Sequence, residues 1–387
     1  MRLLTIFGPP GHGTKTVATA MAQRRGVPIV YGDLNRGFSA QPPRRHLYRW
    51  RQSRPLPFAR WPTRELLRAP DARWLSLGAD WAAACLPGHP WLGATRMAHF
   101  ALADAALVVV DPARLTTAIE AELVEQLLTA RHLGVRRVHA YVNEFDVAPE
   151  LTALGMELVV ATAARAGFTD CFVAAGCAAR AVAANAEEGL AVLWERIDAS
   201  PRRRFPPASP FATVALDDYL ISGRGVVIAG RICSGSVRVG DSVTLWTRRG
   251  QRRLDTEVRS IHGFREPRSS ATVGDVVGIL VPEDIWRMGR GSILAASDSI
   301  SFTSELELPV CWRYAAPAAA REYQVSMLGI TSGALGRPTR KGLALTLRTP
   351  LPAFAGAPMC IRSDHRLVGW AALPVYPRLS ARIPSSA

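Results

Sequence analysis

The first two hundred residues alternate short apolar runs with amphipathic stretches of helical length. Each apolar run is followed closely by Gly, Asp or Asn. The runs are Leu3–Phe7, Leu107–Val110, Val138–Val142 and Cys171–Ala174. Helical patterns lie between them, at Thr116–His132 and Asn185–Ile197. Strands that alternate with helices predict a doubly wound parallel sheet, whose ligands bind at the carboxyl ends of the strands.

The pattern changes after a segment rich in proline and arginine, Ser200–Pro210, which is typical of a linker. From Phe211 to about Ala296, short β-branched runs are separated by glycines, a pattern that predicts a small antiparallel barrel. A third β-rich stretch runs from Ser299 to Tyr376, and a loose tail follows it. The chain is therefore expected to divide into residues 1–205, 206–298 and 299–387.

The length and composition indicate a globular protein. A chain of 387 residues can hold two or three cores, and 48% hydrophobic with 20% charged residues is typical of folded domains. No run of eighteen apolar residues occurs, and the apolar run at the N-terminus is too short for a signal peptide. We therefore predict a cytoplasmic protein without a membrane partner. The six cysteines and eight histidines form no CxxC or HExxH pair, so buried reduced thiols are expected rather than disulfides or zinc ligands.

The net charge is +15, with a pI near 10.5, and Lys15 and Lys341 are the only lysines. Such an excess favours a polyanionic partner, because arginine neutralises phosphates and releases their counterions. Charge alone leaves tRNA, the ribosome and non-specific binding open. The segment Arg36–Trp74 interleaves arginine with tryptophan, which suits either nucleic-acid contact or a solvated loop.

An ordered series of strand and glycine-turn motifs runs through the middle of the chain. It consists of Ile221–Arg231, Ser234–Asp241, Val273–Leu280 and Asp284–Gly291. This series resembles the second domain of the elongation factor Tu family, and Ile361–Gly369 resembles the closing strands of its third domain. The resemblance implies an α/β P-loop GTPase-like doubly wound sheet followed by two antiparallel β-barrel domains. It also implies that GTP or GDP binds to the first domain, with Mg²⁺.

The stretch Gly8-Pro-Pro-Gly-His-Gly13 lies where this family carries its phosphate loop, after a strand and before a helix. Backbone N–H groups in such a loop bind phosphate. The resemblance implies nucleotide contacts from Gly8, Gly11, His12, Gly13, Thr14, Lys15 and Thr16. Without a gap, Thr14 falls on the family's phosphate-binding lysine and Lys15 on its Mg²⁺-binding hydroxyl. With one inserted residue, Lys15 and Thr16 would serve instead, and Thr16 would bind the metal.

Two further segments resemble the switches of the family. Pro87-Gly88-His89 matches the second switch, where Gly88 would sense the γ-phosphate and His89 would position the attacking water. Cys85 replaces the family's magnesium-site aspartate, and a neutral thiol is a poor ligand for a hard cation. Arg36–Ser39 resembles the first switch, with Ser39 as a Mg²⁺ ligand.

Base recognition is expected at Asn143-Glu-Phe-Asp146, where the family has NKxD. Asp146 would accept hydrogen bonds from guanine N1 and N2, and Asn143 would brace the loop. Glu144 replaces the lysine that packs along the base, which should weaken binding. Gly176-Cys177-Ala178 resembles the family's GSA element, whose backbone faces guanine O6.

The resemblance leaves two functions in competition. One is a GTP-dependent factor that binds tRNA or the ribosome, with impaired hydrolysis and a possible nucleotide-exchange factor. The other is a pseudo-GTPase module that binds RNA or a translation-factor partner without a nucleotide cycle. Val276 stands where the family has a polar asparagine, and the third domain is shortened, so delivery of standard aminoacyl-tRNAs is not expected. The apparent lack of further C-terminal domains argues against a selenocysteine-specific variant.

Overall fold

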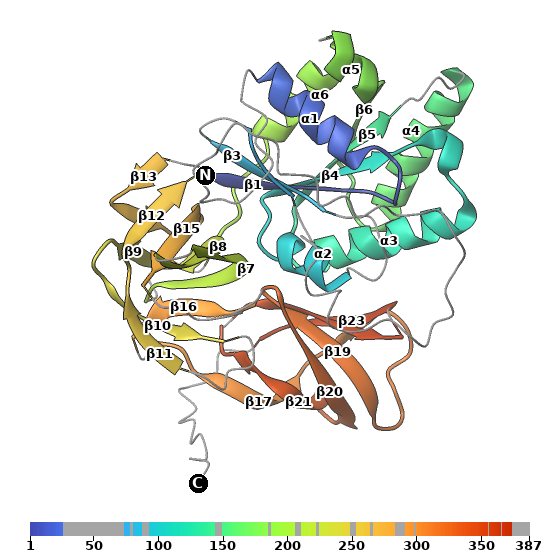
Figure 1. The fold of residues 1–387 in the computed structure, drawn as a ribbon. Helices are drawn as coiled ribbons and strands as arrows, with labels where there is room; N and C mark the ends of the chain where they lie inside the picture. Colours follow the sequence, from blue (N-terminus) through green and yellow to red (C-terminus); the bar gives the residue numbers. More distant parts are fainter. Residues whose placement is uncertain are drawn as a thin grey trace, which may run out of the picture.

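The fold contains three β-sheet units, arranged in chain order (Figure 1). The computed structural model describes residues 1–25, 73–77, 80–86, 93–143, 149–184, 187–205, 210–221, 224–247, 253–263, 266–282, 291–297, 299–354, 356–364 and 366–373. The sheets lie within residues 2–176, 212–296 and 302–372. This is the expected architecture, a parallel α/β sheet followed by two curled antiparallel half-barrels.

The first unit is a six-stranded sheet that is parallel except for its edge strand β2. Across the sheet the order is β2 (Arg73–Ser76), β3 (Trp81–Cys85), β1 (Arg2–Phe7), β4 (Ala105–Val110), β5 (Arg137–Asn143) and β6 (Phe172–Gly176). Every residue of β4 is buried, as expected for a central parallel strand that is covered on both faces. The predictions of β1, β4, β5 and β6 are confirmed to within two residues.

Helices cover both faces of this sheet (Figure 1). One face packs against α1 (Thr14–Arg24), α5 (Ala178–Ala184) and α6 (Leu190–Asp198). The other packs against α2 (Gly93–Phe100), α3 (Thr117–His132) and α4 (Pro149–Arg165). Thr116 caps α3 by accepting a hydrogen bond from the Ile119 N–H at 3.3 Å, as its position before an apolar run predicts. The prediction for α6 began too early, because Glu188 and Gly189 have φ angles of 43° and 68° and cannot continue a helix.

The second unit is an eight-stranded antiparallel sheet, with a separate ribbon formed by β9 (Ser236–Arg238) and β14 (Ser270–Thr272). Its strands, in sheet order, are β11 (Arg253–Glu257), β10 (Ser242–Trp246), β16 (Ile293–Ala296), β7 (Ala212–Ile221), β8 (Gly225–Ser234), β15 (Val276–Val281), β12 (Ser260–Gly263) and β13 (Glu266–Arg268). Val276 is buried in β15 and belongs to the hydrophobic cluster that also contains residues of the first and third units.

The third unit is a seven-stranded antiparallel sheet. Its order is β17 (Phe302–Leu308), β21 (Gly342–Pro352), β20 (Ile330–Thr339), β19 (Arg321–Met327), β22 (Pro358–Ser363), β23 (Arg366–Ala372) and β18 (Cys311–Trp312). Helix α3 packs against β22 and β23. There the Glu125 carboxylate pairs with Arg313 and accepts the Leu367 N–H at 3.1 Å, and His132 stacks on Trp370 at 3.6 Å between ring centroids.

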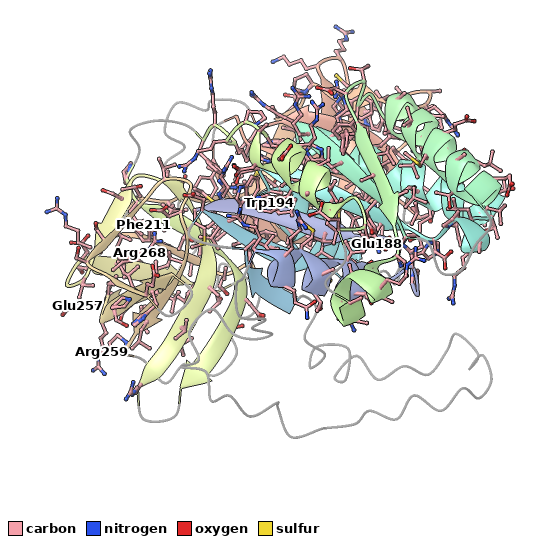
Figure 2. The ribbon with its side chains drawn as sticks, turned by 90° about the horizontal axis from the view of Figure 1, so that it is seen from above. Glu188, Trp194, Phe211, Glu257, Arg259 and Arg268 are labelled. Carbon is pink, nitrogen blue, oxygen red and sulfur yellow. The ribbon has the colours of Figure 1, made fainter. Side chains whose placement is uncertain are left out.

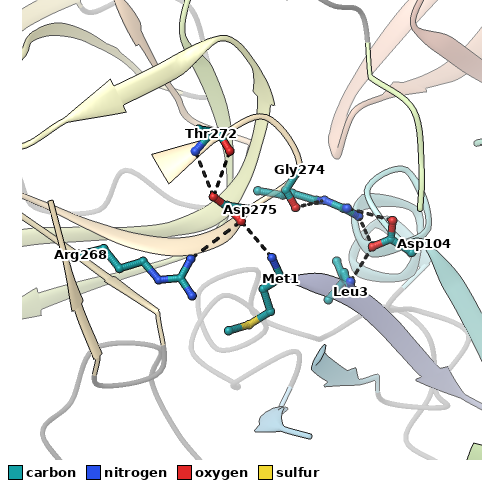
Figure 3. A network of polar contacts seen from close by, with 8 residues as sticks. Met1, Leu3, Asp104, Arg268, Thr272, Gly274 and Asp275 are labelled. Carbon is teal, nitrogen blue, oxygen red and sulfur yellow. Dashed lines mark hydrogen bonds and ion pairs between the residues drawn. The ribbon is translucent and has the colours of Figure 1, made fainter. Parts of the chain in front are cut away.

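The first and second units meet at a buried polar network centred on Asp104 (Figure 3). The Asp104 carboxylate accepts hydrogen bonds from the backbone N–H groups of Leu3 and Arg203, both at 2.6 Å, and pairs with Arg231 of β8. Beside it, the amino group of Met1 lies 2.9 Å from Asp275 Oδ1. The first strand and the linker are thus tied to the second unit by one carboxylate.

The cysteines were expected to be buried, reduced thiols, and not all of them are buried. All six are free thiols, and Cys85, Cys177, Cys233 and Cys360 are buried, whereas Cys311 is exposed. Burial raises the pKa of Cys360 to about 12, so this thiol stays neutral at physiological pH. No helix in the described part of the chain is long and apolar enough to cross a membrane.

Candidate functional site

The glycine loop lies at the carboxyl end of β1, as the strand pattern predicts. Gly11 and Gly13 have φ angles of 83° and 89°, which strain other residues. A Cβ atom at Gly8 would collide with the Val109 carbonyl oxygen of β4, and one at Gly13 would collide with Asn143 Nδ2. The loop is therefore folded tightly against two neighbouring strands and depends on glycine at these positions.

Helix α1 begins at Thr14, directly after Gly13, which is its N-cap. Of the two alignments left open by the sequence, this geometry favours the one without an insertion. A Cβ atom at Gly8 would lie 3.3 Å from Thr14 Oγ1, so the Thr14 hydroxyl points back to the loop. Lys15 and Thr16 follow at rotations of about 100° and 200° around the helix axis. Thr14 and Thr16 therefore face different sides, and Lys15 is exposed.

His12 is 1% exposed, and its side chain is used inside the protein. Its Nδ1 atom accepts a hydrogen bond from the Asp111 N–H at 2.8 Å. Burial lowers the pKa of His12, with a smaller opposing effect from Asp111, so the imidazole is neutral at pH 7. His12 therefore fixes the loop to the end of β4, and only its main chain faces the rest of the site.

Asn143 joins three of the segments that the sequence assigned to the nucleotide. Its Nδ2 atom donates to the His12 carbonyl at 3.2 Å, and its Oδ1 atom accepts from the Ala178 N–H at 3.1 Å. Its side chain is fully buried, so both bonds are shielded from water. The bracing role predicted for Asn143 corresponds to this bridge between the glycine loop and residues 176–178.

The segment Gly176-Cys177-Ala178 is held from its other side by Glu188. The Cys177 N–H donates to Glu188 Oε2 at 2.9 Å, and Arg180 Nε lies 3.2 Å from Glu188 Oε1. Gly176 has no room for a side chain, because a Cβ atom would lie 2.6 Å from the Glu188 carbonyl oxygen. Glu188 lies on the first unit, on the side away from the second (Figure 2). The N–H groups of Cys177 and Ala178 are thus bonded to protein acceptors.

Several predicted site residues lie outside the described residues, namely Ser39, Gly88, His89, Glu144 and Asp146. Cys85 ends β3 and is 4% exposed, whereas Asp80 precedes the other end of that strand and cannot replace its missing carboxylate. Within the described part of the chain, no group of three His, Cys, Asp or Glu side chains could hold a metal ion. These residues do not fit the Mg²⁺ site that the resemblance implies.

The sequence reading missed Asp111 and Arg114, which follow β4 at the same edge of the sheet. Asp111 is 3% exposed and caps the short 3-10 helix η2 (Pro112–Arg114) by accepting the Ala113 N–H at 3.0 Å. Arg114 Nε lies 3.1 Å from Asp111 Oδ2. An acidic residue directly after a buried parallel strand is a signal that could have marked this position.

Comparisons with known proteins agree with this architecture. Residues 225–284 match the family model of elongation factor Tu domain 2. The translation elongation factor SelB from Methanococcus maripaludis in complex with the GTP analogue GppNHp is similar in structure, with a TM-score of 0.71 and 17% identity over 96% of this chain and 78% of that chain. Its apo form gives a TM-score of 0.69, with the same identity and coverage. A bacterial selenocysteine-specific elongation factor, EF-Sec, gives 0.68 and 16% identity over 99% of this chain and 60% of that chain.

The fold is that of the translational GTPases. Residues 225–284 are thus similar to domain 2 of elongation factor Tu, and the fold of the chain is similar to that of the elongation factors SelB and EF-Sec. At 16–17% identity the solved structures establish the fold alone. The matches cover 96% and 99% of this chain, but 78% and 60% of the chains of SelB and EF-Sec.

Proposed function

We propose that this protein is a translation factor that binds guanine nucleotide at the edge of its first sheet. The observation that supports the proposal best is the position of Asn143, which bonds the glycine loop on one side and Ala178 on the other. A loop of positive-φ glycines at the start of α1 offers backbone N–H groups to phosphate. Asp146 completes the proposal as the residue that selects guanine.

Hydrolysis of GTP is impaired in this proposal. Thr14 is uncharged where the family has lysine, and Cys85 ends β3 where the family has a carboxylate. Losing one preorganised charged contact in a site of this kind lowers the rate by roughly 10² to 10³. His89 remains the proposed residue for positioning water. Turnover is therefore expected to be slow.

An RNA partner, tRNA or ribosome, is the second part of the proposal. One end of the third sheet carries five exposed cations, none of which makes an ion pair with another described residue. They are Arg321, Arg337, Arg340, Lys341 and Arg366. The strand registers bring them to the same end, because Arg321 is opposite Gly336 and Arg366 is opposite Ser363. The exposed acids there are Glu307, Asp364 and Glu322, and Glu322 already pairs with Arg348, so the end is net positive. The proposal also includes a cytoplasmic location and a nucleotide-exchange factor as partner.

The proposal is tested by titrating the full chain with fluorescent analogues of GTP and GDP, with and without Mg²⁺, and with ATP as competitor. Micromolar or tighter binding that ATP does not displace would support it, and ribosome-stimulated hydrolysis would be measured next. Binding that is absent at millimolar nucleotide would overturn it.

A nucleotide-independent RNA- or protein-binding module is the second candidate. The observation that favours it is the pairing of the Cys177 and Ala178 N–H groups with Glu188 and Asn143. A donor that is already satisfied inside the protein gains little from a base carbonyl. This candidate predicts the same RNA affinity with GTP, with GDP and without nucleotide.

A further inference from the structure

Arg114 lies directly against the glycine loop. A Cβ atom at Gly11 would be 2.8 Å from Arg114 Nη1, which places this nitrogen within about 4.3 Å of the Gly11 Cα atom. Gly11 is exposed and its φ angle is 83°, so the loop presents main chain rather than a side chain toward the guanidinium. A positive charge therefore stands beside the backbone that is proposed to hold phosphate.

Asp111 positions the Arg114 side chain through an ion pair. The ion pair joins Arg114 Nε to Asp111 Oδ2 at 3.1 Å. The Asp111 side chain is 4% exposed and the Arg114 side chain 61% exposed, so the carboxylate is fixed while the arginine faces solvent. Asp111 is in turn fixed by the His12 imidazole, which accepts its N–H. The cation is thus positioned by the same residues that shape the loop.

The positive charge of Arg114 also affects the pKa of a residue in the glycine loop, His12. The Arg114 cation contributes to the lowered pKa of His12, and the Asp111 carboxylate opposes it. Both groups are therefore close enough to affect a residue of the glycine loop. Thr14 brings no charge to the start of α1, and α1 has no acidic residue in its first turn that would repel an anion.

We propose that Arg114 binds a phosphate group of the nucleotide and replaces the lysine that is missing at Thr14. This inference rests on the proposed nucleotide binding and identifies a residue that neither the resemblance nor the sequence pattern assigned. An arginine can donate two hydrogen bonds to one phosphate, which makes it a strong phosphate ligand even when the loop offers only backbone N–H groups. The bound phosphate would contact the Gly11 main chain on one side and a terminal nitrogen of Arg114 on an adjacent side.

The competing interpretation is a surface ion pair between residues three apart, which contributes little to binding or stability. The two interpretations differ in their dependence on phosphate. If Arg114 binds phosphate, its substitution weakens the affinity for GDP and GTP and leaves the affinity for guanosine unchanged. If Arg114 forms only a structural ion pair, its substitution changes the affinities for all three compounds equally, or changes none of them.

The test measures the affinities of guanosine, GMP, GDP and GTP for the wild-type chain and for the variants Arg114→Gln and Arg114→Lys. Arg348→Gln is the matched control, because Arg348 is an exposed arginine in an ion pair, with Glu322, far away in the third sheet. Arg114→Gln is expected to weaken GDP and GTP binding by about tenfold or more, with guanosine unchanged. Arg114→Lys should recover part of the loss, and Arg348→Gln should change nothing. Thermal melting of each variant checks that it is folded.

Two results would overturn the assignment while the proposed function stands. One is wild-type affinity for GDP and GTP in Arg114→Gln, and the other is an equal loss for guanosine. If the wild-type chain and Arg348→Gln bind no nucleotide at all, the proposed function fails and the assignment of Arg114 fails with it.

Discussion

Arg231 of the second domain pairs with Asp104 in the first: its Nη2 atom donates to Asp104 Oδ1 at 2.9 Å, and its Nη1 atom lies 2.7 Å from Asp104 Oδ2. The Arg231 side chain is 2% exposed and the Asp104 side chain 0% exposed, so the ion pair is buried away from water. Arg231 Nε also donates to the Gly274 carbonyl at 2.9 Å, and its guanidinium lies 4.9 Å from the Phe205 ring centroid. The junction of the two domains therefore depends on a charge pair whose hydrogen bonds are nearly all made within the protein.

Removing one partner of a buried ion pair leaves the other charge without compensation. Asp104→Asn is therefore expected to lower the free energy of unfolding by about 3 to 5 kcal/mol, measured by urea denaturation. Glu322→Gln, which breaks the exposed pair with Arg348, is the control and should change it by about 1 kcal/mol or less. Equal effects of the two substitutions would contradict the role given to Asp104.

Asn143→Ala removes the bridge between the glycine loop and Ala178. Two buried backbone groups, the His12 carbonyl and the Ala178 N–H, lose their partner, at about 1 to 3 kcal/mol each. We expect a less stable protein that no longer binds guanine nucleotide, as measured by thermal melting and titration. Thr116→Ala, which removes only the cap of α3, should cost about 1 kcal/mol and leave nucleotide affinity unchanged. Unaltered nucleotide binding in Asn143→Ala would exclude the proposed site.

His139 should make stability depend on pH. It is 4% exposed, its Nε2 atom lies 2.9 Å from Ser200 Oγ, and burial, with smaller effects from Arg137 and Arg196, lowers its pKa from 6.5 to about 4. The unfolded chain takes up this proton below pH 6.5 and the folded chain only near pH 4, so stability present above pH 6.5 is lost as the pH falls toward 4. The loss from this group is on the order of 3 kcal/mol at most. Urea midpoints at pH 7 and pH 4.5 should differ less in His139→Gln, and an unchanged difference would be evidence against this titration.

The cationic end of the third sheet should control RNA affinity and its salt dependence. The triple variant Arg337→Gln, Arg340→Gln and Lys341→Gln is expected to reduce the slope of log affinity against log salt by about 2 to 3. Arg165→Gln, on an exposed arginine of α4 that pairs with Glu120, serves as the control. RNA binding that does not weaken with salt, or that is unaltered in the triple variant, would show that this end is not the contact.

Strands β1, β4 and β5 could be predicted because they are buried almost throughout and read as continuous apolar runs. The start of α6 could not, because the positive φ of Glu188 follows from its tertiary contacts rather than from its residue type. Strands β2 and β3 were not predicted from the sequence either. Strand β2 pairs with β3 at the edge of the sheet, and its sequence, rich in arginine and tryptophan, carries no clear strand pattern.

The candidate site also combines residues that the sequence could predict with contacts that it could not. The glycine loop and Asn143 stand next to strands in the sequence, so a local motif was enough to find them. The contacts of Glu188 with Cys177 and of Arg114 with Gly11 join residues from different loops. Nothing in the local sequence marks such pairs, and only the packing of the loops brings them together.

The most direct test of the proposed site compares GDP binding by the wild-type chain and by Gly13→Ala, with ATP as competitor. A Cβ atom at Gly13 would collide with Asn143 Nδ2 and would strain a φ angle of 89°, so the variant cannot keep both the loop and its bridge. We expect guanine-specific binding by the wild-type chain that falls at least about tenfold in Gly13→Ala. Absent GDP binding by the wild-type chain, or equal binding by both proteins, would contradict it.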